Sequence, residues 1–105
     1  MTHHTADATL KVLDTGSKHT NLGATGAITL NLPLNAPKGT YYEFFVAAAQ
    51  TVEVACDGNE VFIINGTTSG GGESAAANDE GETLKVTSSG SGHWLCTVTG
   101  TWTVS

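Results

Sequence analysis

The chain has 105 residues, which is enough for one domain with a single hydrophobic core. Apolar residues make up 39% of it, too many for a disordered chain, and charged residues only 13%, about half the share in a typical soluble domain. Four Lys and ten acidic residues give a net charge of −6, which argues against nucleic acid or an anionic membrane surface as a partner.

Apolar and polar residues alternate with period two, and Gly, Pro, Asn and Asp separate the runs, so the sequence predicts an all-β fold. The pattern gives about eight short strands. Strands of this number and length predict a single domain over residues 1–105, either an antiparallel β-sandwich or a barrel-like pair of sheets. No apolar run approaches the ~20 residues of a membrane-spanning helix, and the first residues do not resemble a secretory signal. We therefore expect a chain kept in a cytoplasm or exported by another route. The predicted strands cover residues 8–13, 19–22, 27–32, 40–47, 51–56, 61–65, 81–87, 93–98 and 101–104.

Three segments are predicted to be irregular. Residues 1–7 form a flexible N-terminal arm. Residues 57–60, Asp-Gly-Asn-Glu, form a tight hairpin turn, so that strand 61–65 returns beside strand 51–56. Residues 66–80 are rich in Gly, Ser and Ala and form a long exposed loop, which is the segment we expect to be mobile or to face a partner.

The strand over residues 40–47 is the richest in aromatic residues and is apolar on both faces. Alternation places Tyr41 and Phe45 on one face, opposite two further aromatic residues. Such a strand belongs in the centre of a sheet or under a subunit contact. Large aromatic side chains supply contact area at low entropic cost, so Tyr41, Phe45 and Trp102 are the candidate protein-contact residues, although a Trp near a chain end also caps a core.

The sequence lacks the residue patterns typical of catalysis, metal binding or cofactor binding, and we predict none of these. His3 and His4 lie in the predicted arm, His19 and His93 are isolated, and no metal-ligand spacing occurs. No Ser lies in a nucleophile elbow. The carboxylates in and just after the 66–80 segment are predicted to be solvated.

Cys56 and Cys96 each lie within a predicted strand. A disulfide would require their Cα atoms to lie within about 7 Å of each other. Free thiols are usual in a reducing compartment. We favour two buried free thiols, and the sequence leaves the pairing open.

Several segments together resemble a module that recurs in structural proteins of tailed phages and prophages. The most specific is Asn-Leu-Gly-Ala-Thr-Gly-Ala-Ile-Thr-Leu-Asn-Leu-Pro at residues 21–33. The resemblance covers nearly the whole chain, from about Ala6 to Thr103. The other similar segments are Ala-Asp-Ala-Thr-Leu (6–10), Asp-Thr-Gly (14–16), Ala-Ala-Gln-Thr-Val (48–52), Gly-Glu-Thr-Leu-Lys-Val (81–86), Gly-His-Trp-Leu-Cys (92–96) and Gly-Thr-Trp-Thr (100–103).

Members of this module occur alone or at the ends of longer virion proteins, as capsid decoration, head fibres and fibre-like appendages, commonly as homotrimers. The resemblance therefore implies a non-enzymatic decoration protein that binds the major capsid protein or another virion protein and stabilises the head surface. The alternative is a phage fibre or receptor-binding module that contacts the host surface, and a small hydrolase is a third, less favoured interpretation. The Gly-rich segment over residues 66–80 departs from the module, which leaves the oligomeric state open.

Overall fold

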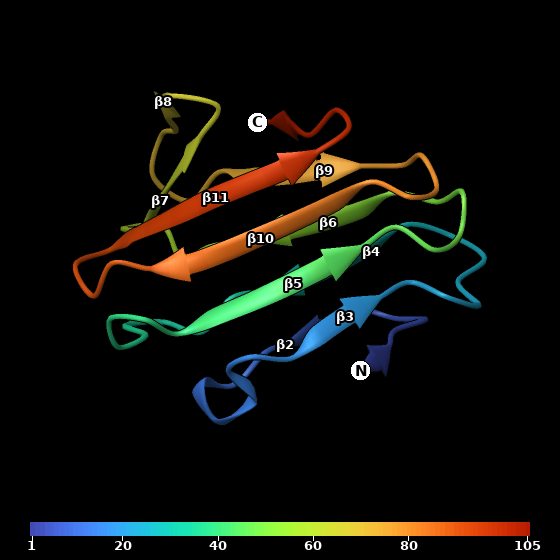
Figure 1. Cartoon of the computed structure of the whole chain (residues 1–105), viewed down its shortest axis with the longest axis horizontal. Helices are drawn as coiled ribbons and strands as arrows, with labels where there is room; N and C mark the ends of the chain where they lie inside the picture. The colour runs from blue at the N-terminus through green and yellow to red at the C-terminus, as the bar shows by residue number, and fades with distance from the viewer.

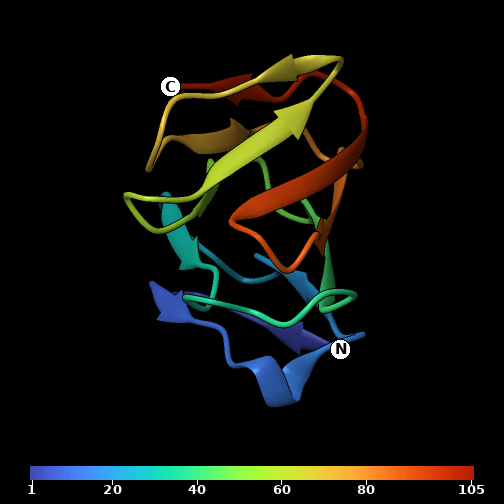
Figure 2. The ribbon, with the colours of Figure 1, turned by 90° about the vertical axis from the view of Figure 1, so that its left-hand side faces the viewer.

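Two β-sheets pack face to face in the computed structural model, which describes all 105 residues (Figures 1 and 2). The predicted all-β sandwich is confirmed. The front sheet, facing the viewer in Figure 1, contains in spatial order β1 (Thr2–His3), β3 (Lys18–Thr20), β5 (Tyr41–Phe45), β10 (Thr83–Ser88), β11 (His93–Thr99), β7 (Val61–Ile64) and β8 (Thr67–Thr68). The back sheet contains β12 (Thr103–Val104), β9 (Ser74–Ala77), β6 (Val52–Ala55), β4 (Ile28–Asn31) and β2 (Ala8–Thr9).

The two sheets are mixed, which differs from the antiparallel pairing expected from the sequence. From β2 to β7 the chain alternates between the back and front sheets, and up to β6 the strands that are next but one in sequence become neighbours. When the chain crosses to the other sheet and back, the strand it then forms runs in the same direction as the strand before the two crossings. For this reason β3 pairs in parallel with β5, and β4 with β6. Only where the chain stays within one sheet, as from β10 to β11, does an antiparallel hairpin form.

The core lies between the sheets, on the inward side of each strand. Period-two alternation turns Ile28 and Leu30 of β4 and Tyr42 and Phe44 of β5 inward, and all four are buried. Trp94 of β11 is the bulkiest fully buried side chain. Burial of this apolar surface, at about 25 cal/mol per Å², is the main force that holds the sheets together.

The first residues form an edge strand, where the sequence predicts a flexible arm. β1 pairs in parallel with β3, and the backbone N–H of His4 donates to the carbonyl of Thr20 at 2.8 Å. His3 Nδ1 lies 2.6 Å from Thr20 Oγ1. The N-terminal segment is therefore tied to the edge of the front sheet by both backbone and side-chain contacts.

The predicted strand over residues 8–13 ends early. β2 covers only Ala8–Thr9, and Val12–Asp14 form a 3-10 turn, η1. The backbone N–H of Asp14 donates to the carbonyl of Lys11 at 2.9 Å, which closes the turn in place of a sheet pairing. Because η1 is the only helical segment and has three residues, no helix of the structure could cross a bilayer.

Residues 66–80 contain two strands, so the prediction of one long exposed loop is wrong for part of this segment. β8 pairs with β7, and β9 lies between β6 and β12 in the back sheet. Ala75 and Ala77 of β9 are buried in the core, whereas Gly70 to Gly72 are exposed as predicted. Small Ala side chains do not produce the hydrophobic contrast by which an alternating strand is recognised.

Residues 57–60 connect the two sheets and do not close the predicted hairpin. β6 lies in the back sheet, while β7 lies in the front sheet and runs parallel to β11. Glu60 is only 4% exposed. Its carboxylate accepts hydrogen bonds from Trp94 Nε1 and from the backbone N–H of Asn35, both at 3.1 Å. A buried carboxyl group with two hydrogen-bond donors thus occupies the last position of the predicted hairpin turn.

Asn21, immediately after β3, is a second buried polar residue and is fully enclosed. Its Oδ1 accepts hydrogen bonds from the backbone N–H groups of Ala47 and Ala48, at 2.7 and 2.9 Å. Its Nδ2 donates to the carbonyls of Ala48 and Gln50, at 3.1 and 3.2 Å. This one side chain fixes the tight connection between β5 and β6, on which the alternation between sheets depends.

Candidate functional site

The outward side of the front sheet, called the front face below, carries a row of three apolar side chains and one threonine across four neighbouring strands, called the apolar row below. The register places Tyr41 of β5 opposite Thr87 of β10, Thr87 opposite Leu95 of β11, and Leu95 opposite Ile63 of β7. Tyr41 is 38% exposed and Leu95 46% exposed, and Ile63 is half-buried. Side chains directly opposite each other on one face are in contact range, so the row forms one continuous strip.

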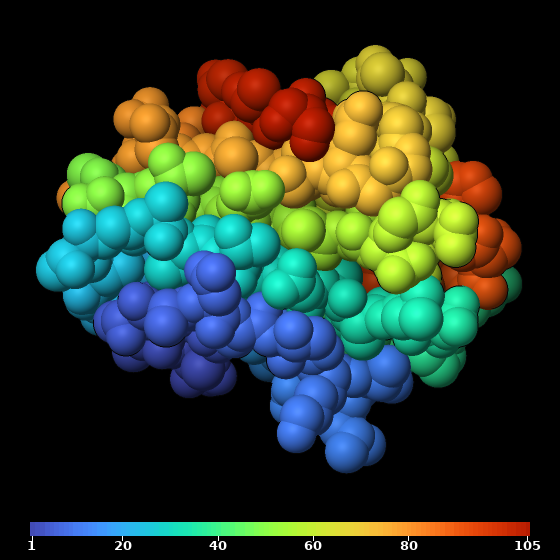
Figure 3. Space-filling view, turned by 180° about the vertical axis from the view of Figure 1, so that it is seen from behind, coloured from blue at the N-terminus to red at the C-terminus, as the bar shows by residue number.

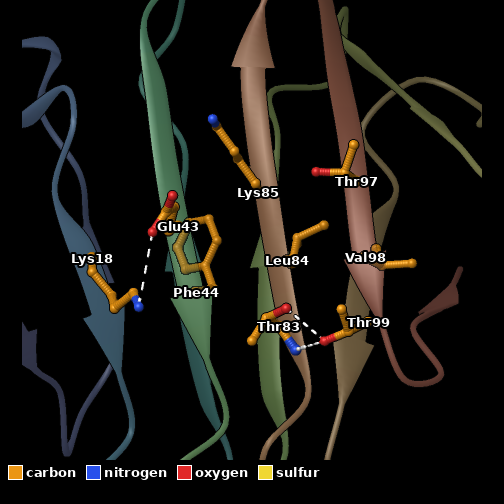
Figure 4. A pocket seen from close by; sticks show the side chains of 9 residues that line it. All are labelled: Lys18, Glu43, Phe44, Thr83, Leu84, Lys85, Thr97, Val98 and Thr99. Atoms are coloured by element: carbon orange, nitrogen blue, oxygen red, sulfur yellow. Dashed lines mark hydrogen bonds and ion pairs between the residues drawn. The ribbon is translucent and has the colours of Figure 1, made fainter.

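A second row of the front face is charged and polar (Figure 4). Lys18, Glu43, Lys85 and Thr97 are aligned across β3, β5, β10 and β11. Lys18 Nζ lies 3.9 Å from Glu43 Oε2. Lys85 Nζ lies 5.0 Å from the centre of the Tyr41 ring, a cation–π distance that joins the charged row to the apolar row.

A shallow hollow of about 270 Å³ lies beside this charged row. Its lining combines the Lys18–Glu43 pair with threonine hydroxyls, and the hydroxyls of Thr83 and Thr99 lie 2.6 Å apart. These groups can donate and accept hydrogen bonds at a surface. The hollow therefore suits contact with polar groups on the surface of another molecule.

Charge is unevenly distributed between the front sheet and the rest of the chain. The strands of the front sheet contain two Lys and one Glu, a net charge of +1. The other two Lys and nine acidic residues, a net −7, lie elsewhere, which together gives the −6 of the whole chain. Because Glu43 is paired with Lys18, the front face can approach another acidic protein without placing an unpaired carboxylate in the contact.

The three candidate contact residues fall into different environments. Tyr41 is exposed on the front face, and Phe45 is half-buried on the same face, near the edge formed by β3 and β1. Trp102 is 5% exposed and belongs to the core, so it is not available for a contact, and the interpretation of a core-capping Trp is the correct one. Sequence reasoning missed Leu95, although its place between Trp94 and Cys96, which point inward, indicates an outward apolar side chain.

A row of hydrogen bonds joins Ser17, His19 and His4. His19 lies in β3, Ser17 just before β3 and His4 just after the edge strand β1. Ser17 Oγ lies 2.7 Å from His19 Nε2, and His19 Nδ1 lies 2.9 Å from His4 Nε2. Ser17 Oγ gives its only proton to the carbonyl of Asp14 at 2.5 Å, so the proton in the Ser17–His19 contact comes from the imidazole. In this arrangement His19 does not activate the serine as a nucleophile, and the chain anchors β1 and η1.

Burial is the main cause that lowers the pKa of His19 to about 4, and the neighbouring His4 contributes to this shift, against a smaller opposing effect of Asp14. The pKa of His4 is also lowered, by burial and by His3. Both imidazoles are therefore neutral in the folded protein near neutral pH, as the hydrogen-bonded chain requires.

This lowered pKa predicts that the folded protein loses stability as the solution is acidified. The folded state binds a proton at His19 less readily than the unfolded state, so the contribution is complete above about pH 6.5 and decreases towards pH 4. From about pH 8 to about pH 5, we expect the free energy of unfolding to fall by about 2 kcal/mol through this residue. Urea unfolding at both pH values would measure it. His19→Gln should lose this pH dependence and His93→Gln should keep it; an unchanged pH dependence in His19→Gln would contradict the assignment.

Cys56 and Cys96 are free and half-buried, which agrees with the favoured prediction of unpaired thiols. Burial, with a smaller contribution from Glu60, raises the pKa of Cys56 to about 11. Burial and the neighbouring Cys56 raise the pKa of Cys96 to about 12. Both groups are thus protonated thiols at neutral pH, the unreactive form.

Alkylation of these thiols is therefore expected to be slow in the folded protein. At about pH 8 the thiolate fraction of each Cys should be at least about a hundredfold lower than in an unfolded chain. Mass spectrometry after timed iodoacetamide treatment, with the urea-unfolded chain as the control, would measure the difference. Equal rates in the two states would show that the thiols are not protected.

No three His, Cys, Asp or Glu side chains come together in a way that could hold a metal ion. The chain matches no protein-family model and no curated protein. The front face and its residues are therefore the features of this chain that bear on its function.

Proposed function

We propose that this chain is a structural protein of a bacteriophage virion, a decoration protein that binds the outside of the head and stabilises it. The observation that carries the proposal is the front face, where Tyr41 and Leu95 of the apolar row are exposed and no unpaired carboxylate is present on the strands. The resemblance of residues 21–33 to the phage module supports the same function.

The front face has the size and chemistry of a protein-binding surface. The molecule measures 34 × 28 × 20 Å, and Figure 1, which looks down its shortest axis, shows the front sheet spread across the two longer dimensions. A stable protein contact takes about 800 Å² from each partner, which a face of these dimensions can supply. Threonine hydroxyls cost less to bury than Lys or Glu side chains, so the polar residues between the apolar ones do not prevent docking.

Binding of this kind stabilises a capsid by linkage. A protein that binds the assembled shell but not its separated subunits adds RT ln(1 + [L]/Kd) per site, about 2.7 kcal/mol when its free concentration is a hundred times Kd. Repeated over many sites of a lattice, this is a large effect that needs no catalytic group. The partner in this proposal is the major capsid protein or another virion protein, and the chain acts as a homotrimer in the virion.

Co-sedimentation with purified particles of the phage that encodes the chain tests the proposal. The protein should travel with the heads, and Leu95→Glu, which places a charge in the apolar row, should abolish this binding. Leu34→Glu, at an apolar residue exposed elsewhere on the surface, is the matched control and should bind normally. A protein that never travels with the heads would refute the proposal, and binding to host cells instead would support the receptor-binding alternative.

A further inference from the structure

A two-residue turn, Asn65-Gly66, joins β7 to β8 at the end of the front sheet. The register pairs Ile64 with Thr67, so only these two residues lie between the paired strands. Both have positive φ, 51° at Asn65 and 76° at Gly66, which is the backbone of a type I′ turn. Both are exposed. Figure 1 labels β8 at one corner of the molecule, and in Figure 3, the view from behind, the yellow segment at that corner projects from the outline.

Asn is a thermolabile residue, because its side chain can react with the backbone nitrogen of the next residue. That nitrogen loses its proton and attacks the side-chain carbon Cγ. The new N–C bond closes a five-membered succinimide ring, the C–N bond of the side-chain amide breaks, and ammonia leaves. Water then opens the ring at either carbonyl and gives Asp or isoaspartate. The reaction needs no enzyme, but it needs a backbone N–H whose proton is not held by a hydrogen bond.

The chain contains six Asn residues, and the backbone N–H that follows is hydrogen-bonded in four of them. These four bonds are Leu22 to Thr20 Oγ1, Leu32 to the carbonyl of Ala55, Glu60 to the carbonyl of Asp57, and Asp79 to Glu82 Oε1. Asn35 shares the positive φ of Asn65, at 55°, but the Ala36 that follows it is buried. Only Gly66 is an exposed residue, directly after an Asn, whose backbone N–H has no hydrogen-bond partner.

The surroundings of the turn leave room for the ring to close. The side-chain amide of Asn65 makes no hydrogen bond that would hold it away from Gly66. Around Gly66 the space is open, since a Cβ atom added there would have no neighbour within 4 Å. Glycine itself offers no side chain to obstruct the attack. Sequence and fold therefore favour the reaction at the same position.

We propose that Asn65 is a modification site, which deamidates in the folded protein without an enzyme, and that its isoaspartate product releases β8 from the front sheet. In isoaspartate the backbone runs through the side chain and gains one methylene group. A two-residue turn of matched twist cannot absorb this length without loss of the register. β8 has only two residues and lies at the sheet edge, so little else holds it.

The modification also changes the charge at this end of the sheet. A carboxylate replaces the amide, so the net charge goes from −6 to −7. Asn65 lines a surface hollow together with Glu73, and two carboxylates in one hollow repel each other. This reaction depends only on the turn, so it is independent of the proposed function.

Peptide mass spectrometry of the purified full chain, incubated at mildly alkaline pH and sampled over time, tests the site. We expect Asn65 to gain the mass difference between an amide and an acid before any other Asn does. Asn65→Gly, which keeps a sequence suited to a type I′ turn, should show no gain at this position. A folded chain in which Asn65 stays intact, while the urea-unfolded chain reacts there, would overturn the proposal.

Asp79→Gly is the matched control, because it creates a second exposed Asn-Gly pair at residues 78–79. The backbone N–H of residue 79 donates to Glu82 Oε1 at 2.9 Å. A hydrogen bond to a charged group should make Asn78 react about tenfold or more slowly than Asn65 in the folded variant. In urea the two pairs should react at similar rates. Equal rates in the folded variant would show that the free N–H of Gly66 does not select the site.

Hydrogen exchange of the β7–β8 peptide tests the structural consequence. The isoaspartate form, separated by chromatography, should lose the protection of the β8 backbone amides. Asn65→Asp has the same charge but a normal backbone, and should keep the protection of the original chain. Unchanged protection in the isoaspartate form would overturn the release of β8, and an equal loss in Asn65→Asp would assign it to charge instead of to the added methylene.

Discussion

Replacement of Asn21 by Ala is expected to lower the free energy of unfolding by about 3 kcal/mol, which corresponds to a fall in Tm of about 15 °C for a domain of this size. The side chain is fully buried and makes four hydrogen bonds to the backbone of residues 47–50. Its removal leaves these backbone groups without partners and empties the space that it fills. Urea unfolding, followed by circular dichroism, measures the change.

Asn21→Asp separates hydrogen bonding from packing, because the two side chains have nearly the same size. Asp retains the two bonds accepted by Oδ1 but places an oxygen where Nδ2 donates to the carbonyls of Ala48 and Gln50. We expect a loss of at least about 2 kcal/mol. Asn78→Ala, at an exposed residue, is the control and should change stability by less than about 0.5 kcal/mol. If Asn21→Asp unfolds like the original chain, packing and not hydrogen bonding accounts for the role of Asn21.

Replacement of Glu60 by Ala is expected to cost about 3 kcal/mol. Trp94 Nε1 lies in the core and would lose its hydrogen-bond acceptor, as would the backbone N–H of Asn35. The segment that joins β6 to β7 would also lose the side-chain hydrogen bond between Glu60 and Trp94 that ties it to β11. Glu80→Ala, at an exposed carboxylate, is the matched control and should be nearly neutral.

A double-mutant cycle with Trp94→Phe shows how much of this loss belongs to the Trp94–Glu60 hydrogen bond. Phe keeps most of the buried apolar surface but has no N–H group, so Glu60→Ala should cost less in the Trp94→Phe background. We expect a coupling energy of about 1.5–3 kcal/mol, the usual range for a hydrogen bond to a charged group. Additive effects would mean that the two side chains act independently.

The front face shows how far the sequence could predict the candidate site. Alternation within residues 40–47 correctly separates Tyr41 and Phe45 from the buried Tyr42 and Phe44. It cannot show that Tyr41 is aligned with Leu95, because that depends on the pairing of three strands that are far apart in the sequence. The contact strip is thus a property of strand register, and only its individual residues can be predicted from local pattern.

The burial of Trp102 and of Glu60 could not be decided from the sequence, for one physical reason. A local pattern reports the polarity of a residue and its neighbours in the chain, but burial depends on what packs against it from elsewhere. Trp102, near the chain end, is covered by the core, and Glu60, in a turn-like segment, is covered because Trp94 and Asn35 supply hydrogen bonds to it. Polar residues that are buried through distant partners cannot be recognised from composition.

The amino-acid sequence by itself determined the fold class, most of the strands and the inward or outward direction of their side chains, because period-two alternation is a local property of extended backbone. The tertiary structure alone decided which strands are neighbours, that the sheets are mixed and that β9 belongs to the back sheet. These features depend on the chain's repeated crossing between the sheets. That path is held by contacts such as those of Asn21 and Glu60, which join residues more than twenty positions apart.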